Sequence, residues 1–104
     1  MSDKVFEALA SSPRRLILAY LSEHELTAGE IASRFEMSAP AVSRHLSVLE
    51  GAGLVSSERR GQFVYYKLMS DNLVNTLTQF AFALCPVAGP LKRESKAKKK
   101  ASEA

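Results

Sequence analysis

The stretch that most constrains the fold of this chain is residues 38–53, SAPAVSRHLSVLEGAG. Val42, Leu46 and Leu49 recur at i, i+4 and i+7, a spacing that places them on one face of a helix. Gly53 suits the left-handed position that commonly follows a helix end. The sequence therefore predicts a short amphipathic helix whose apolar face belongs to a core.

A second short helix is expected just before this one. Thr27 and Glu30 have the spacing of a capping box, which opens a helix over residues 28–35. Ser38 then restarts the chain as the N-cap of the next helix. Two short helices joined by a tight turn, the second with a lean polar outer face, are typical of a helix-turn-helix.

A β-hairpin is expected directly after the helix-turn-helix. Leu54-Val55 begins its first strand, residues 58–62 turn the chain, and residues 63–68, FVYYKL, return it. Side chains alternate along a strand, so either Tyr65 or Tyr66 is expected in the core. A hairpin in this place is a wing, and its turn carries two arginines.

These segments carry a family resemblance. SAPAVSRHLSVLEGAGLV followed by RRGQFVYYKL resembles the recognition helix and wing of the ArsR-type winged-helix repressors. ALASSPRRLILAYL looks like that family's first-to-second helix junction, and the resemblance covers most of residues 3–85. It implies a homodimeric bacterial transcription repressor, usually released from DNA by an effector. Some members are simple autorepressors, and this chain resembles that group.

Helices are also expected on both sides of the helix-turn-helix. Two of them precede it, over residues 2–10 and over residues 12–22, the second with Ser12 as its cap. The third follows the hairpin: Ser70 caps it, and Pro86 ends it. The expected fold is mainly α with a small hairpin: four helices, the hairpin and a fifth helix.

The last helix has more apolar surface than a small domain needs to close one core, which suggests that a second copy covers it. The resemblance likewise implies a dimer through the first and last helices. The residues assigned to this interface are Val5, Phe6, Leu9, Leu73, Leu77, Phe80, Ala81 and Leu84.

The outer face of helix 38–53 is small and polar with one cation, which suits base edges in a major groove. Ser43 and Arg44 are the main base-reading candidates, and the wing residues suit the minor groove or backbone. For His45 a packing role and a phosphate contact both stay open. Arg14 is equally open between solvation and phosphate contact. The residues assigned to double-stranded DNA are Ser38, Ala39, Pro40, Ser43, Arg44, His45, Ser47, Arg59, Arg60, Gln62 and Arg14.

Charge is distributed unevenly along the 104 residues. The formal net charge of +3 is concentrated in residues 92–104, so the DNA-binding field of the folded part must come from locally placed arginines. We expect one domain over residues 1–88 and a disordered Lys-rich tail over residues 89–104. The tail is either a solubilising end or a non-specific DNA tether.

Metal and thiol chemistry receive little support. Metal-sensing members of the family carry ligands on the helix before the recognition helix or on the last helix. Residues 29–33 hold no Cys or His, and the last helix offers Asp71 and Cys85, far apart. A tetrahedral site needs about four ligands, so neither a metal nor a cofactor is expected. The lone Cys85 fits a reducing cytoplasm, and a thiol-responsive regulator acting through it stays an alternative.

Other function classes are also weakly supported. No apolar run of membrane-spanning length appears, and no Gly-rich phosphate loop or clustered catalytic triad suggests an enzyme. The remaining rival is a winged-helix adaptor that binds a protein. An adaptor would more often show apolar anchors on the recognition face, where this chain has Ser43 and Arg44. The effector is unknown.

Overall fold

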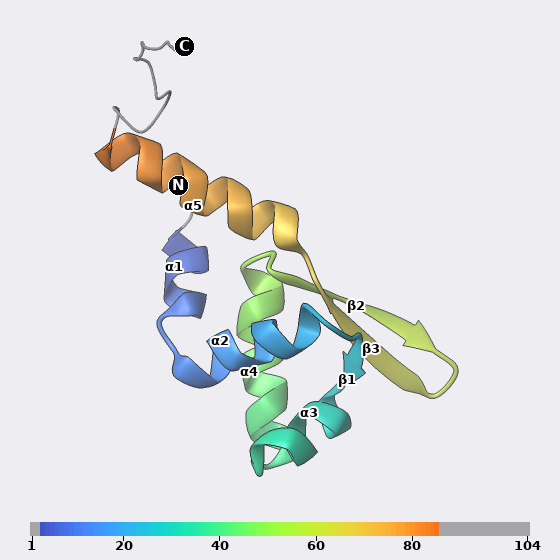
Figure 1. Ribbon diagram of the computed structural model, residues 1–104. Helices are drawn as coiled ribbons and strands as arrows, with labels where there is room; N and C mark the ends of the chain where they lie inside the picture. The colour runs from blue at the N-terminus through green and yellow to red at the C-terminus, as the bar shows by residue number, and fades with distance from the viewer. Residues whose placement is uncertain (1–2, 86–104) are drawn as a thin grey trace. The chain divides into compact units, whose positions relative to one another are not determined.

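A computed structural model describes residues 3–85 of the chain (Figure 1). Within that range, five helices and three strands follow one another as α1 (Asp3–Leu9), α2 (Ser12–Leu21), β1 (Leu26–Thr27), α3 (Ala28–Phe35), α4 (Ala39–Gly51), β2 (Val55–Arg60), β3 (Phe63–Leu68) and α5 (Ser70–Leu84). Residues up to Leu73 form one compact unit, and α5 from Val74 onward belongs to a second. The predicted tail, residues 89–104, and the break at Pro86 lie outside the described residues.

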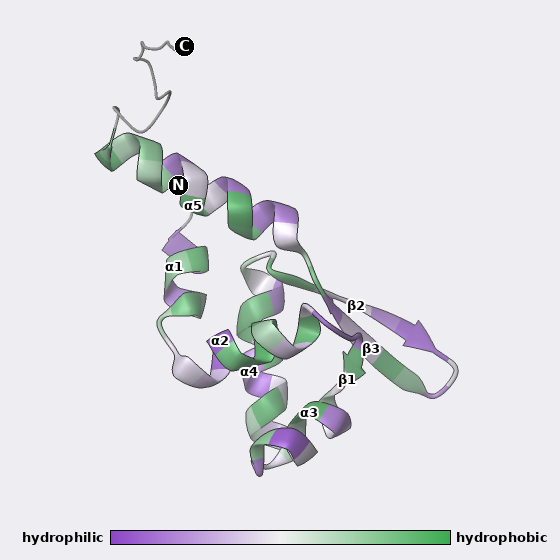
Figure 2. Cartoon of the chain, in the orientation of Figure 1, coloured by the Kyte–Doolittle hydropathy of each residue, from purple (hydrophilic) through white to green (hydrophobic). Residues whose placement is uncertain are grey.

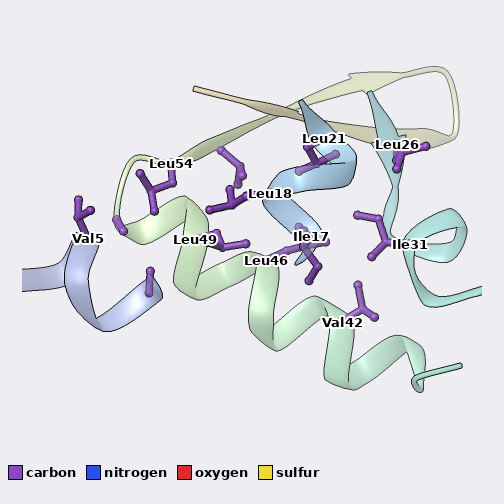
Figure 3. Packing of buried hydrophobic residues seen from close by; sticks show 13 residues of the cluster. Val5, Ile17, Leu18, Leu21, Leu26, Ile31, Val42, Leu46, Leu49 and Leu54 are labelled. Carbon is purple, nitrogen blue, oxygen red and sulfur yellow. The ribbon is translucent and has the colours of Figure 1, made fainter. Parts of the chain in front are cut away.

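The apolar face of α4 lies at the centre of the core, as the sequence predicts. Val42, Leu46 and Leu49 are almost completely buried, and Figure 3 shows them facing side chains of α2 and α3. The other buried members of this cluster are Val5, Ala8, Ile17, Leu18, Leu21, Leu26, Ile31, Ala52, Leu54 and Val55. α4 is therefore anchored to the core along its length.

Two predicted helix caps are confirmed. Thr27 Oγ1 accepts from the backbone N–H of Glu30 at 3.1 Å, and Glu30 Oε1 accepts from the backbone N–H of Thr27 at 2.9 Å, completing the capping box. Ser38 Oγ accepts from the N–H of Ala41 at 3.2 Å at the start of α4. These caps satisfy backbone donors that helix starts leave unpaired, so they fix where α3 and α4 begin.

The predicted cap of α2 is wrong by one residue. Ser11, not Ser12, has the extended N-cap conformation, and its hydroxyl accepts from the N–H of Arg14 at 3.4 Å. Ser12 is already helical. Ser70 is likewise the first helical residue of α5 rather than the residue before it. Adjacent serines have equal capping ability, so the residue type alone does not distinguish them.

The sheet has three strands, and the predicted hairpin accounts for two of them. The strand order is β1-β3-β2, with Leu26 opposite Tyr66 and Arg60 opposite Phe63. β1 is two residues long, too short to show the alternation that identifies a strand. The turn is also shorter than expected: residues 58–60 belong to β2, and Gly61 and Gln62 form the connection.

The end of α4 is tied to the start of α5. Gly53 has φ of 76°, as its predicted place after the helix requires. Nδ2 of Asn72 donates to the carbonyl oxygens of Ala52 at 2.9 Å and Gly53 at 3.2 Å. Leu73, half-buried, packs against the core cluster. Asn72 thus pairs main-chain carbonyls next to the end of α4, which would otherwise need water.

The part of α5 beyond Leu73 is an amphipathic helix with exposed apolar side chains. Leu77, Phe80 and Leu84 are 41%, 38% and 64% exposed, while Thr76 is buried. Figure 2 shows the hydrophobic character increasing toward the C-terminal end of α5. None of the helices between residues 3 and 85 has the length and apolar character needed to cross a bilayer.

Candidate nucleic-acid interface

The outer face of α4 presents a polar, solvent-exposed surface. Ser43, Arg44 and Ser47 are all exposed, opposite the buried leucines. Within residues 3–85 the Arg44 guanidinium makes no hydrogen bond or ion pair. Its donors are therefore available to an acceptor outside the chain. A guanidinium carries a planar fork of donors that matches the O6 and N7 acceptors of guanine.

The beginning of α4 is also exposed. Ser38, Ala39 and Pro40 lie at the N-terminal end of the helix. Backbone N–H groups and the positive end of the helix dipole meet here, which favours an anion such as phosphate. The structure brings these residues onto the same element as Arg44. Their contact with DNA stays a prediction.

The two wing arginines have different surroundings. Arg60 forms ion pairs with Glu58 at 2.9 Å and with Glu25, and its guanidinium lies 4.8 Å from the centroid of the Tyr65 ring. The hydrogen bond from Arg60 lowers the pKa of Glu58 from its ordinary value. Arg59 is exposed and, within residues 3–85, makes no such ion pair.

Strand geometry explains the difference. Neighbouring residues of a strand point to opposite faces, so Arg59 and Arg60 face opposite ways. Tyr66 is the tyrosine that packs against the core, and Tyr65 is the one beside Arg60. Figure 2 shows the hydrophilic end of β2 meeting the hydrophobic start of β3 at the wing tip. Gln62, in the connection between them, is exposed.

The two arginines at the start of α2 cap α1. Arg14 Nε donates to the carbonyl oxygen of Ala8 at 2.8 Å and Nη2 to that of Glu7 at 2.9 Å. Arg15 Nη1 donates to the carbonyl oxygen of Leu9 at 2.5 Å. α1 has no basic residue in its own last turn, and cations at a helix C-terminus are favourable. The interpretation of Arg14 as a freely solvated side chain is therefore wrong. A contact between Arg14 and a DNA phosphate stays a prediction.

His45 lies on the flank of α4 that turns toward α2. It is half-buried, and its Nδ1 is 3.3 Å from Nη1 of Arg14. Burial, then the charges of Arg14 and Arg44, lower the pKa of His45 below its ordinary 6.5. The imidazole is therefore neutral near pH 7.

Acidification is expected to destabilise the protein through His45. Because the pKa is lower in the folded chain than the unfolded value of 6.5, the unfolded chain binds more protons between the two values, and stability falls as the pH drops through that interval. The free energy of unfolding of the wild type and of His45→Gln should be measured by urea titration from pH 7.5 down. His45→Gln should lose less stability below pH 6.5; parallel curves would contradict the assignment.

The residues assigned to the dimer interface differ in how far they are buried in the single chain. Val5 is completely buried in the core of its own chain, so the structure places it elsewhere than expected. Phe6 and Leu9 are half-buried, and Leu9 packs against the core cluster. Ala81 is exposed along with Leu77, Phe80 and Leu84 of the α5 stripe.

The acidic, histidine and cysteine side chains form no metal-binding cluster in the part of the chain that the structure describes. No group of three or more His, Cys, Asp or Glu side chains within residues 3–85 is placed to hold a metal ion. Cys85 is a free, exposed thiol.

Sequence reasoning missed the ion pair between β2 and Glu25 and the capping of α1 by arginines of α2. Glu25 and Arg60 are 35 positions apart and have no local pattern in common. The capping of α1 by Arg14 and Arg15 left a weak signal: a short helix without a basic last turn, followed within six residues by two arginines.

Comparisons with known proteins agree with this geometry. Residues 11–57 match the family described as bacterial regulatory protein, arsR family. The transcriptional repressor SdpR of Bacillus subtilis is 40% identical over 75 residues, covering 72% of this chain and 83% of SdpR. The transcriptional activator HlyU of Vibrio cholerae is 41% identical over 69 residues, 66% of this chain and 64% of HlyU.

Solved structures show the same fold. A homodimeric winged helix-turn-helix DNA-binding domain from Mycobacterium bovis, described as a possible ArsR-family transcriptional regulator, superposes with a TM-score of 0.64 at 30% identity, covering 83% of this chain and 75% of that one. The match to SdpR spans most of both proteins. This chain belongs to the arsR family of bacterial regulatory proteins.

Proposed function

We propose that this chain is a homodimeric transcriptional repressor that binds an inverted-repeat operator through α4 and the wing. The observation that carries the proposal is the exposed, unpaired Arg44 between the short hydroxyl side chains of Ser43 and Ser47, on a helix whose other face is fully buried. Such a face can approach base edges closely. The proposal adds repression because SdpR is named a repressor, although HlyU is named an activator.

The dimer is proposed to form through α1 and α5. The exposed apolar residues Leu77, Phe80 and Leu84 supply the surface that a second copy would cover. The relative from Mycobacterium bovis is described as homodimeric. Two copies related by two-fold symmetry would present two α4 helices to two half-sites. We place this activity in the bacterial cytoplasm, where the DNA is.

In vitro selection from random duplex DNA at near-physiological salt tests the proposal. Enrichment of an inverted repeat, with half-site centres about 10 bp apart or a multiple of that, is expected for a two-fold dimer. Weak binding that vanishes with salt, without an enriched sequence, would instead favour the adaptor function, because a charged surface alone gives that behaviour.

Arg44→Ala is expected to reduce discrimination between matched and mismatched sites by about 1–3 kcal/mol, since a bidentate contact to guanine is lost. Fold stability should not change, because Arg44 is exposed and makes no hydrogen bond or ion pair within residues 3–85. Fluorescence anisotropy on the selected duplex and on single-mismatch duplexes measures the change. Equal losses on every duplex would show that Arg44 does not read a base.

The wing arginines are expected to respond differently to salt. Arg59→Ala should lower the slope of log affinity against log salt by about 0.9, the value for one phosphate contact. Arg60→Ala should leave that slope nearly unchanged, because Glu58 and Glu25 already neutralise its charge. Titrations of both variants at several salt concentrations measure the slopes. A change in slope for Arg60→Ala that exceeds the change for Arg59→Ala would mean that Arg60 breaks its ion pairs with Glu58 and Glu25 to bind DNA.

A further inference from the structure

Arg14 joins three helices, and one of its contacts reaches the recognition helix. Two of its nitrogens donate to carbonyl oxygens at the end of α1, those of Glu7 and Ala8. The third, Nη1, lies 3.3 Å from Nδ1 of His45. Arg14 itself belongs to α2, and His45 adjoins Arg44 on α4. The side chain therefore links α1 and α2 to a residue beside the surface proposed to meet DNA.

The contact with Arg14 determines which nitrogen of His45 carries the hydrogen. A guanidinium has five N–H donors and no acceptor. Nδ1 must therefore accept, which requires a neutral imidazole protonated at Nε2. The two nitrogens lie on different sides of the ring, so the Nε2–H is directed away from Arg14. His45 is only half-buried, and within residues 3–85 its Nε2 makes no hydrogen bond, so this hydrogen has no acceptor in the described part of the chain.

We propose that Arg14 is a positioning residue that orients His45 so that its Nε2–H donates to a phosphate oxygen of the DNA backbone. The inference rests on the proposed function, because it requires α4 to dock on DNA. Phosphate and sugar oxygens accept half or more of protein–DNA hydrogen bonds, and such bonds fix the register of a helix on the duplex. His45 would thus set how α4 lies, while Arg44 beside it reads the base.

Two substitutions of His45 separate its two nitrogens. In His45→Asn the amide lies where Nδ1 was, so an acceptor for Arg14 remains and the outer donor is lost. In His45→Gln the longer amide reaches the Nε2 position. On a duplex enriched by the wild-type protein, His45→Asn should bind about tenfold more weakly, the usual loss for a hydrogen bond to a charged acceptor. His45→Gln should retain most of the affinity.

The salt dependence distinguishes this contact from a cationic one. A neutral donor displaces no counterion, so neither His45 variant should change the slope of log affinity against log salt. The loss should also be equal on matched and mismatched duplexes, because phosphates carry no sequence information.

Arg14→Met tests the positioning role, with Arg15→Met as the matched control. Both variants remove a donor from the end of α1, but Arg15 contacts the carbonyl of Leu9 and the hydroxyl of Ser12, not His45. Arg14→Met should weaken DNA binding about as much as His45→Asn, and the double variant should be no weaker than either. Arg15→Met should bind like the wild type. If Arg14→Met does not fold, the comparison of His45→Asn with His45→Gln tests the inference, because neither substitution removes the hydrogen bonds from Arg14 to α1.

Nitrogen NMR of the imidazole gives a readout independent of DNA. We expect Nδ1 unprotonated and Nε2 protonated in the wild type, and a mixture of tautomers in Arg14→Met. A protonated Nδ1 in the wild type, or wild-type affinity in His45→Asn, would overturn the inference while leaving the proposed function standing. A wild-type protein that enriches no duplex refutes the proposed function, and the phosphate contact with it.

Discussion

Leu77→Asp is expected to convert the proposed dimer to a monomer and to weaken operator binding about 100- to 10,000-fold, the range lost when two linked binding sites act separately. A carboxylate at a two-fold interface is buried once in each copy, and burying a charge costs free energy, so the dimer incurs the desolvation cost twice. Leu77 is 41% exposed in the single chain, and the substitution should therefore leave the fold intact. Sedimentation velocity and anisotropy titrations measure the two effects.

Gln79→Asp is the matched control for this experiment. Gln79 is exposed on the same helix, and two positions along a helix place it on roughly the opposite side from Leu77. The control adds the same charge and should remain dimeric with nearly unchanged DNA affinity. A Leu77→Asp protein that stays dimeric would move the interface away from the α5 stripe.

Gly53→Ala is expected to lower the free energy of unfolding by about 2–4 kcal/mol, combining the cost of a left-handed residue with a β-carbon and the loss of one or two hydrogen bonds. The φ of Gly53 is +76°, and an added Cβ would lie 2.8 Å from Nδ2 of Asn72. Asn72 would have to move, releasing its bonds to the carbonyls of Ala52 and Gly53. Urea unfolding at neutral pH measures the change.

Gly51→Ala, two residues earlier, is the control for Gly53→Ala. Apart from its chain neighbours and the backbone of its own helix, no heavy atom lies within 4 Å of the position where its Cβ would be, and Gly51 is the last residue of α4. Alanine there should stabilise the helix by up to about 1 kcal/mol. If Gly53→Ala and Gly51→Ala had the same free energy of unfolding, neither the left-handed backbone of Gly53 nor the close approach of Asn72 would affect stability.

Local patterns explain why the helix-turn-helix was predictable. The capping box of Thr27 and Glu30, the cap at Ser38 and the periodic Val42, Leu46 and Leu49 each act within a few residues, and all are confirmed. In each case backbone pairing and side-chain burial favour the same structure. The family resemblance rests on the same segments, which is why family and fold agree.

The features that sequence reasoning missed depend on tertiary contact. β1 is a strand only because β3 lies beside it. The side chains of Arg14 and Arg60 are directed by α1 and by Glu25, which periodicity along one element does not reveal. Val5 was assigned to a dimer by its apolar character, yet that character equally serves the chain's own core. The DNA and dimer contacts of the remaining site residues stay predictions.

The division of α4 into a buried and an exposed face bears on how such a regulator diverges. Ser43, Arg44 and Ser47 are all exposed, so exchanging them alters the surface proposed to read bases at little cost to folding. Val42, Leu46 and Leu49 are under the opposite constraint, because each is buried. If α4 reads bases as proposed, duplicated copies of such a gene can acquire new operators through a few surface substitutions, and the same three positions are where an engineered library should be randomised.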